Sequence, residues 1–360
     1  MLTALLSLVL AASPVPAVTP LSLPPPTGPA RVGTVTAHLI DRSRPDPWVA
    51  TGKNRELMVS IWYPARTVRG HQRADWVSPG IAARVNPPGS PYALPVTHGH
   101  LGAPPAAGRH PVILYSPGFG LERTSGTTLV EDLAAHGYVV VTIDHTHDAG
   151  LVEFPDGRIA TGTVAPPASP EEEEKLLEKV LDVRVRDTRF VLDQLGRMQL
   201  SRTMDLSRVG MFGASMGGAT AAGVMHADRR VRAGIDLDGS VVGPVLGSGL
   251  NRPFLLFGSD SHGDQDETWT RLWDRLRGPR YRLEITDSAH LSFTDHQALL
   301  PQLGLPAEQV EPVIGTIGAH RSIAIQRTYV RAFFDRHLRQ HGGGLLDRPS
   351  PRYPEVTFHP

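Results

Sequence analysis

Short apolar runs of strand length recur along the chain, and stretches with helical periodicity separate most of them. Residues 32–40 and 56–63 come first, and together they predict an antiparallel hairpin, because apolar and polar side chains alternate in them. Residues 111–116 and 138–143 are compact and apolar, which is typical of strands buried on both faces of a sheet. Four further strand-like runs follow at residues 209–212, 231–237, 253–257 and 281–285.

The order of these runs predicts the fold class. Strand, helix and strand between residues 111 and 143 form a right-handed βαβ unit, which requires a parallel sheet. Eight strands, six of them alternating with helices, predict one doubly wound α/β domain. We therefore expect an eight-stranded, mostly parallel sheet with helices on both faces.

The predicted helices begin and end at recognisable residues. Ser169 is an N-cap, and Glu172 stands three residues later, where it closes a capping box. The helix that begins there covers the sheet to about residue 198. Residues 267–276 form another helix, whose Trp269 and Trp273, four residues apart on one face, are expected in the core, and residues 320–338 form a final amphipathic helix.

Composition changes along the chain divide it into segments. Residues 18–30 are rich in proline and are expected to be an extended linker outside the fold. A single domain follows at residues 31–340, and a C-terminal tail at residues 341–360. Within the domain, residues 64–110 are rich in Pro, Gly and His with little periodicity, so they are expected to run irregularly over the surface.

Residues 1–17 resemble a secretory signal peptide. Leu2–Ala12 is a short apolar segment, and Val15-Pro16-Ala17 approximates the small-residue cleavage pattern. The apolar segment is too short to span a bilayer. Secretion is therefore expected, and a cytoplasmic protein with an apolar tail is the alternative.

Composition limits the chemistry and the partners. The formal net charge is zero, which gives no overall electrostatic attraction to nucleic acid or to an anionic membrane. The chain has no cysteine, so disulfides, thiolate metal sites and cysteine nucleophiles are excluded. The oligomeric state is left open.

The candidate chemistry begins at Gly213-Ala214-Ser215-Met216-Gly217, the G-x-S-x-G pattern of a nucleophile elbow. An apolar strand precedes the pattern and a helix of small residues follows it. In such a turn the hydroxyl of Ser215 is lifted above the sheet. A serine hydroxyl is a weak nucleophile, so it needs a base and a group that orients the base.

The base and the acid are expected at the ends of later strands, in the order serine, acid, histidine. His290 lies just past the last strand and is the candidate base. Asp238 ends the strand that follows the elbow, and it is the preferred acid. Asp260 and Asp264 follow the next strand and are alternatives.

A tetrahedral intermediate also needs two hydrogen-bond donors directed at its oxyanion. The backbone N–H of Met216, directly after the nucleophile, is one candidate. The other is the backbone N–H of Phe119, in the turn Pro117-Gly118-Phe119-Gly120 after the strand at residues 111–116.

The histidine-rich stretch Asp144-His145-Thr146-His147-Asp148 contains residue types that bind metal ions. A His-x-His pair on an extended segment chelates metal ions, but no third ligand at suitable spacing is visible. The stretch is therefore interpreted as a loop beside the active-site cleft, and no metal site is expected.

Several segments together resemble the secreted platelet-activating factor acetylhydrolases and their bacterial lipase-like relatives, in the α/β-hydrolase superfamily. They extend over about residues 57–293. The matching segments are Ser60-Ile61-Trp62-Tyr63-Pro64, RHPVILYSPGFGLERT, LAAHGYVVVTIDHTHDA, GASMGGA, IDLDG and SAHLSF. The resemblance implies an α/β-hydrolase fold with Ser215 as nucleophile, Asp238 as acid and His290 as base, and with oxyanion donors at Phe119 and Met216. It thus supports Asp238 over the later aspartates.

Together these features predict a carboxylic ester hydrolase of the lipase or esterase type, with an acyl-serine intermediate and no cofactor. Its substrate would be a small-molecule or lipid ester. Hydrolysis of a lactone, peptide, cutin or other polyester on the same triad is an alternative. A binding protein that kept the fold and lost the chemistry is a second alternative.

Overall fold

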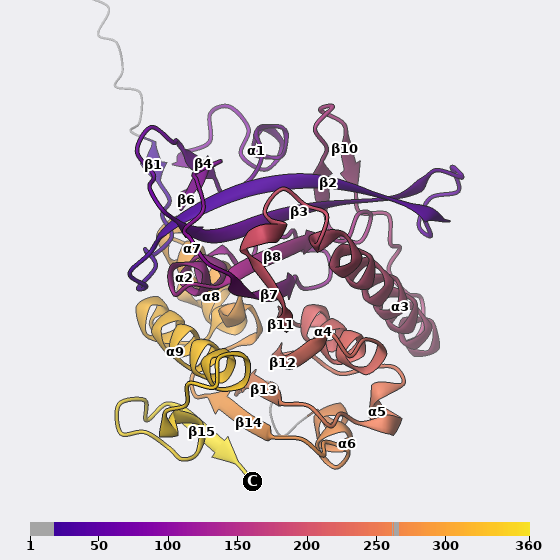
Figure 1. The fold of residues 1–360 in the computed structure, drawn as a ribbon, viewed down its shortest axis with the longest axis vertical. Helices are drawn as coiled ribbons and strands as arrows, with labels where there is room; N and C mark the ends of the chain where they lie inside the picture. The colour runs from indigo at the N-terminus through magenta and orange to yellow at the C-terminus, as the bar shows by residue number, and fades with distance from the viewer. Residues whose placement is uncertain (1–17, 261, 263–265) are drawn as a thin grey trace, which may run out of the picture.

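The computed structural model describes residues 18–260, 262 and 266–360. The expected signal peptide, residues 1–17, and the candidate acid Asp264 lie outside the described residues. In the described part of the chain, strands and helices alternate around one large twisted sheet (Figure 1).

The sheet contains eleven strands among the described residues, in the order β15-β14-β13-β12-β11-β7-β8-β3-β2-β6-β4. Eight consecutive strands in this order correspond to the eight predicted from the sequence. They are β2 (Arg31–Pro45), β3 (Asn54–Ala65), β7 (His110–Ser116), β8 (Val139–Asp144), β11 (Met204–Ala214), β12 (Val231–Leu237), β13 (Phe254–Ser259) and β14 (Arg280–Ile285).

The pairing confirms the predicted topology of these eight strands. β2 and β3 form the antiparallel hairpin, and β3 is also antiparallel to β8. From β8 to β14 the six neighbouring strands are all parallel. The carboxyl ends of the parallel strands therefore meet at one edge of the sheet, where α/β proteins build their sites.

The predicted strand count of eight is wrong because three further strands extend the sheet at its two edges. β15 (Val356–His359) lies in the predicted tail and pairs antiparallel with β14. β6 (Val96–Leu101) and β4 (Arg73–Asp75) lie in the stretch expected to be irregular, and β6 pairs parallel with β2. Each of these added strands pairs with backbone N–H and C=O groups that its neighbouring strand would leave unpaired at the edge of the sheet.

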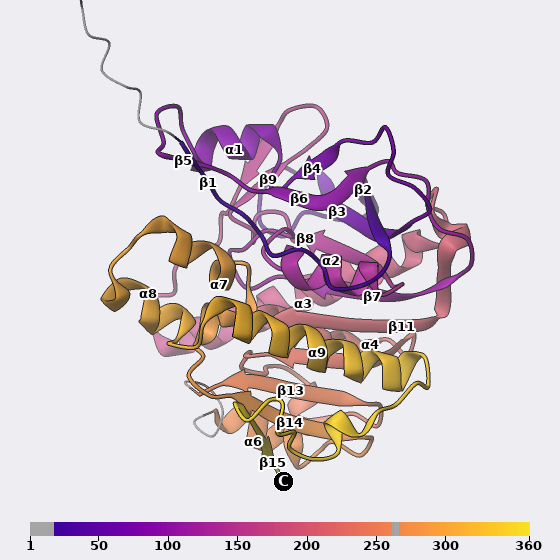
Figure 2. The ribbon, with the colours of Figure 1, turned by 90° about the vertical axis from the view of Figure 1, so that its left-hand side faces the viewer.

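Helices cover both faces of the sheet, as predicted (Figures 1 and 2). One face carries α2 (Thr127–Ala135) and α9 (Ala319–Leu338), which share an apolar cluster with the sheet. The other carries α3 (Pro170–Leu195), α4 (Met216–Ala227) and α6 (Glu267–Trp273). The remaining elements are short: β1 (Thr19–Pro20), β5 (Tyr92–Ala93), β9 (Leu151–Glu153), β10 (Ile159–Thr161), α1 (Pro79–Val85), α5 (Val245–Ser248), α7 (His296–Leu299) and α8 (Ala307–Ile314).

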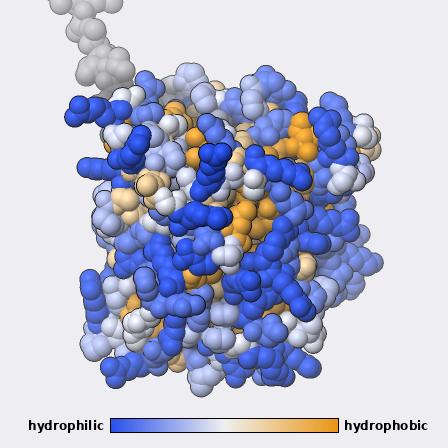
Figure 3. All heavy atoms as spheres, in the orientation of Figure 1, coloured by the Kyte–Doolittle hydropathy of each residue, from blue (hydrophilic) through white to orange (hydrophobic). Residues whose placement is uncertain are grey.

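Two local predictions about the helices are confirmed. The side chain of Ser169 accepts a hydrogen bond from the backbone N of Glu172 at 3.3 Å, so it caps α3. The carboxylate of Glu172 accepts from the backbone N of Ala168 at 2.9 Å in place of that of Ser169, so the expected closure of the capping box is wrong. Trp269 is fully buried in the core under α6. In the view of Figure 3 the surface is mostly hydrophilic, and apolar residues gather only in small separate patches.

Residues 18–30 pack on the domain, which corrects the expectation of a linker outside the fold. Leu21 and Leu23 are buried in a small apolar cluster with residues that include Ile323 of α9. Arg327 of α9 donates hydrogen bonds to the carbonyl oxygens of two of the prolines, at 2.8 and 2.9 Å. Proline lacks an N–H but keeps its carbonyl acceptor, so a Pro-rich segment is well suited to bind a guanidinium group.

Among the helices of the described ranges, none combines the length and the apolar composition that crossing a membrane requires.

Candidate active site

The G-x-S-x-G pattern forms the predicted strand–turn–helix. β11 ends at Ala214, α4 begins at Met216, and Ser215 between them has φ 54° and ψ −126°. A positive φ is unfavourable for a residue with a side chain, so the surrounding structure must hold Ser215 in this conformation. A Cβ atom on Gly217 would lie 1.9 Å from the carbonyl oxygen of Ser116, so only glycine permits this close approach.

His290 and Asp238 are brought together from the ends of two different strands. Nδ1 of His290 lies 2.7 Å from Oδ2 of Asp238. The other carboxylate oxygen of Asp238 accepts a hydrogen bond from the backbone N of Ser259 at 2.6 Å. Asp238 is buried, whereas 47% of the His290 side chain is exposed. The buried carboxylate therefore orients the ring from within the protein through Nδ1.

The turn that carries Asp238 lies against the backbone of Ser215. The backbone N of Ser215 donates to the carbonyl oxygen of Leu237 at 2.8 Å, directly before Asp238. A Cβ atom on Gly239 would lie 2.1 Å from the carbonyl oxygen of Ser215. The nucleophile candidate and the acid candidate are thus held on neighbouring strands, β11 and β12.

The alternative acids are placed differently. Asp260 accepts a hydrogen bond from the backbone N of Asp287 at 2.5 Å, so its carboxylate supports the turn before His290. Asp264 lies outside the described residues. Of the described candidates, Asp238 is the one whose carboxylate contacts the His290 ring.

A second carboxyl group, Asp236, lies beneath the same turn. It is fully buried and accepts a hydrogen bond from the backbone N of Gly239 at 3.0 Å. Burial, followed by the negative charge of Asp238, raises the pKa of Asp236 well above its usual value. The raised pKa favours the protonated form of Asp236, whereas Asp238 is the residue whose carboxylate contacts the His290 ring.

The predicted oxyanion turn lies next to Ser215. A Cβ atom on Gly118 would lie 3.6 Å from Cβ of Ser215. Phe119 is exposed, and Met216 is buried as the first residue of α4. The N–H groups in the first turn of a helix lack intrahelical partners, so that of Met216 remains available for an oxyanion. Of the two predicted donors, Met216 directly follows Ser215, and Phe119 directly follows Gly118, whose backbone lies next to Ser215.

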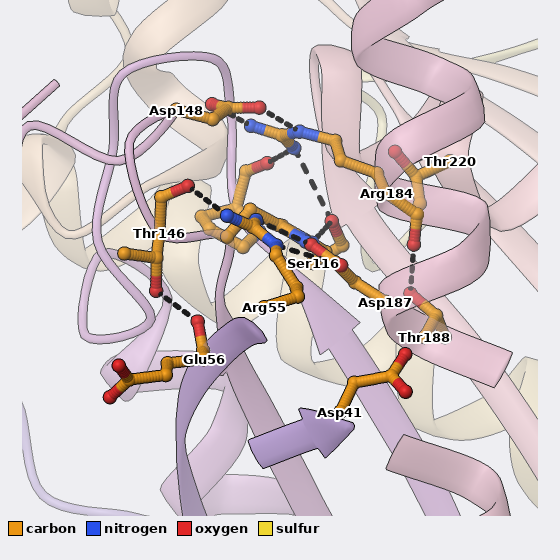
Figure 4. A network of polar contacts seen from close by, with 12 residues as sticks. Asp41, Arg55, Glu56, Ser116, Thr146, Asp148, Arg184, Asp187, Thr188 and Thr220 are labelled. Carbon is orange, nitrogen blue, oxygen red and sulfur yellow. Dashed lines mark hydrogen bonds and ion pairs between the residues drawn. The ribbon is translucent and has the colours of Figure 1, made fainter. Parts of the chain in front are cut away.

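Sequence reasoning missed a cluster of buried charged groups beneath this turn (Figure 4). Arg184 of α3 contacts the turn and pairs with Asp148. Nε2 of His145 lies 2.9 Å from Oγ of Ser116, and its Nδ1 lies 3.0 Å from Asp187. A signal was present, because Arg184 and Asp187 stand three residues apart on the apolar face of a predicted helix, where charged side chains need buried partners.

Ser116, His145 and Asp187 have the side-chain types of a catalytic triad, but all three are fully enclosed. Burial lowers the pKa of His145, although the hydrogen bond to Asp187 opposes the shift. A substrate on the surface does not reach this serine. The three residues are therefore structural, whereas Ser215 is only partly buried and its backbone lies against the turn that carries Asp238.

The histidines of the stretch at residues 144–148 contact protein groups. Both ring nitrogens of His145 have side-chain partners, and Nδ1 of His147 lies 3.0 Å from the carbonyl oxygen of Thr161. Within the described ranges, no group of three or more His, Cys, Asp or Glu side chains is arranged to hold a metal ion. His145 and Asp148 are buried, so these two residues belong to the support of the site and not to its surface.

Asp295 connects the segment after His290 to the segment after the oxyanion turn. Its carboxylate accepts hydrogen bonds from the backbone N atoms of Thr127 and Thr128, at 3.1 and 2.9 Å, at the start of α2. It also accepts one from Nε1 of Trp76 at 3.0 Å. Asp295 is almost fully buried, and burial raises its pKa to about 7 despite these donors.

This shift predicts a pH-dependent stability. Folded Asp295 holds its proton more tightly than the unfolded chain does, so the unfolding free energy should fall as the pH rises from about 4 to about 7 and then level off. The contribution of one proton is at most about 1.4 kcal/mol per pH unit. Asp295→Asn should remove it, so the stability of the variant relative to wild type should improve with pH.

Urea unfolding across this pH range measures the effect. Asp182→Asn, at an exposed position of α3, is the matched control and should leave the pH dependence unchanged. Parallel curves for wild type and Asp295→Asn would show that Asp295 does not titrate in this window.

The comparisons with known proteins agree with this architecture. The family model for platelet-activating factor acetylhydrolase, isoform II, matches residues 89–155. The structure resembles that of a ferulic acid esterase from Streptomyces cinnamoneus, with a TM-score of 0.83 and 41% identity, covering 94% of this chain and 99% of that chain.

Curated relatives match over part of their length. A probable 1-alkyl-2-acetylglycerophosphocholine esterase from Arthroderma benhamiae is 34% identical over 263 residues, which are 69% of this chain and 66% of the relative. A platelet-activating factor acetylhydrolase from Cavia porcellus is 25% identical over 222 residues, 52% of this chain and 49% of the relative. The chain thus spans between about half and about two thirds of these curated relatives. The chain belongs to the α/β-hydrolase superfamily, in a group of serine ester hydrolases related to the platelet-activating factor acetylhydrolases.

Proposed function

We propose that the protein hydrolyses carboxylic esters with Ser215 as nucleophile, His290 as general base and acid, and Asp238 as the group that orients His290. The observation that carries the proposal is the 2.7 Å contact between Nδ1 of His290 and Oδ2 of Asp238, beside a serine held at positive φ. A carboxylate on Nδ1 selects the tautomer whose Nε2 accepts a proton.

The reaction has two halves. In the first, Nε2 of His290 takes the proton from Oγ of Ser215 as Oγ attacks the ester carbonyl carbon. The backbone N–H groups of Phe119 and Met216 stabilise the oxyanion that forms. His290 then gives its proton to the leaving alcohol as the carbon–oxygen bond breaks, and an acyl-serine remains.

In the second half, water replaces the alcohol. His290 takes a proton from the water, whose oxygen attacks the acyl-serine carbonyl. The second tetrahedral intermediate collapses, His290 returns the proton to Oγ of Ser215, and the carboxylic acid leaves. No metal or organic cofactor takes part in these steps.

Labelling with a fluorophosphonate tests the nucleophile. The wild-type protein should bind one phosphonyl group, and mass spectrometry of peptides should place it on Ser215. Heat-denatured protein is the control and should bind none. A native protein that stays unlabelled would instead support a non-catalytic member of the fold.

The names of the relatives support two candidate acyl groups for the substrate. The Arthroderma and Cavia proteins support an acetyl ester, and the Streptomyces structure supports a hydroxycinnamoyl ester. The identity is higher and the coverage wider for the Streptomyces protein, so the hydroxycinnamoyl ester is a specific second candidate. The kcat/KM values for methyl ferulate, a 2-acetyl phospholipid and 4-nitrophenyl acetate, measured side by side, distinguish the two.

A further inference from the structure

The guanidinium group of Arg184 is fully buried beneath the turn that carries Phe119 (Figure 4). Its Nε and one Nη bind both oxygens of Asp148, each at 2.6 Å. The same Nη donates to the carbonyl oxygen of Gly118 at 3.1 Å, and the other Nη donates to the carbonyl oxygen of Pro117 and to Oγ of Ser116. A guanidinium group has five N–H donors, and here each has an acceptor.

These contacts determine how the turn is oriented. In a trans peptide, the C=O of one residue and the N–H of the next point in opposite directions. The Gly118 carbonyl is directed at Arg184, so the N–H of Phe119 is directed away from Arg184. By the same rule, the Pro117 carbonyl directs the N–H of Gly118 away from the guanidinium group. The carbonyl oxygens of Pro117 and Gly118 are thus held inside, and the N–H groups of Gly118 and Phe119 are directed away from the guanidinium group.

Other contacts hold Arg184 itself in place. Asp148 neutralises its charge and also accepts a weaker hydrogen bond, at 3.4 Å, from the backbone N of Gly120 in the same turn. Ser116, which receives one of the Arg184 donors, is bound on its other side by His145. A buried ion pair with all of its donors satisfied has one stable geometry, because any rotation would leave a buried charge without a partner.

We infer that Arg184 is a positioning residue for the oxyanion hole: it holds the Gly118–Phe119 peptide in the orientation that directs the Phe119 N–H toward the oxyanion formed at Ser215. The inference rests on the proposed function. Leu121 also donates to the Gly118 carbonyl, from its backbone N at 3.2 Å, so loss of Arg184 would loosen this peptide without releasing it completely.

Arg184→Lys tests the inference. A lysine ammonium is a compact charge and does not bridge Asp148 and two carbonyl groups as the planar guanidinium does. We expect kcat/KM for 4-nitrophenyl acetate to fall about 10- to 100-fold, less than the loss of an entire oxyanion donor. The inhibition constant of an alkyl trifluoromethyl ketone, which forms a tetrahedral oxyanion adduct with the serine, should rise by the same factor.

A parallel change in kcat/KM and in the inhibition constant distinguishes a positioning role of Arg184 from a general structural role. Arg327→Lys is the matched control, because Arg327 is also buried and donates to carbonyl oxygens, those of Pro24, Pro25 and Thr128, but does not contact residues 116–118. It should lower the melting temperature while kcat/KM and the inhibition constant of the folded protein stay within about twofold, since its oxyanion donors are undisturbed. A folded Arg184→Lys protein with both constants equal to those of wild type would overturn the inference.

Two further measurements decide the question if Arg184→Lys does not fold. Asp148→Asn keeps the side-chain volume and weakens the support of Arg184, so both constants should change in parallel by a smaller factor. A crystal structure of the wild-type adduct with the trifluoromethyl ketone should place the oxyanion within hydrogen-bond distance of the Phe119 N. An adduct whose oxyanion does not contact Phe119 would overturn the inference. A wild-type protein that cleaves no ester would instead refute the proposed function.

Discussion

Replacing Ser215 with alanine should lower kcat for a short-chain 4-nitrophenyl ester by about 10⁴- to 10⁶-fold, because no acyl-serine forms without the hydroxyl. The fold should survive, since the strained backbone at Ser215 is held by the Leu237 carbonyl and not by the side chain. Residual cleavage would come from the oxyanion donors acting on water. Steady-state kinetics, with circular dichroism to verify folding, measures the change.

Ser207→Ala is the matched control for this prediction. Ser207 is an exposed serine near the amino end of the same strand, at the opposite end from the elbow, and its hydroxyl contacts Asp205. Its substitution should leave kcat unchanged. Turnover by Ser215→Ala close to that of wild type would mean that another group is the nucleophile.

Asp238→Asn should reduce kcat by about 10⁴-fold, while KM changes little. An amide at this position donates to Nδ1 of His290 or loses the contact, so the ring adopts the tautomer whose Nε2 carries a proton and accepts none. The substitution alters the contact between Oδ2 of Asp238 and Nδ1 of His290, which lie 2.7 Å apart.

The same experiment includes the two alternative acids. Asp260→Asn should lower kcat by less than about tenfold, because its carboxylate binds the backbone of Asp287 and acts only through the turn before His290. Asp264→Asn completes the series. A large loss confined to Asp260 or Asp264 would assign the acid to that residue.

The sequence predicted the inner part of the sheet well and its edges poorly. A compact apolar run such as residues 138–143 is typical of a strand buried between two layers of helices, and β8 was predicted on this basis. β6 has the sequence VTHGHL, in which polar residues and a glycine obscure the alternation. Its pairing with β2 is a long-range contact that no local pattern encodes.

In the candidate site, too, some residues could be predicted from a local segment and others could not. Ser215 lies in a local motif, and His290 follows a recognisable strand, so each could be proposed from its own segment. The choice between Asp238 and Asp260 depended on which strand end faces the histidine, and this is a property of the folded sheet. Arg184 was missed because it lies 66 residues from Gly118 and binds main-chain carbonyl groups, which leave no trace in side-chain patterns.

The docking of residues 18–30 on the domain constrains the order in which the protein folds. Arg327 binds the carbonyl oxygens of Pro24 and Pro25 across sequence separations of 303 and 302 residues, and Gln302 binds Ser22 across 280. Contacts of such long range form only after the entropy of closing a very large loop has been overcome. During synthesis, the first described residues must therefore wait until α9 has left the ribosome, and the apolar surface around Ile323 is covered only at the end of folding.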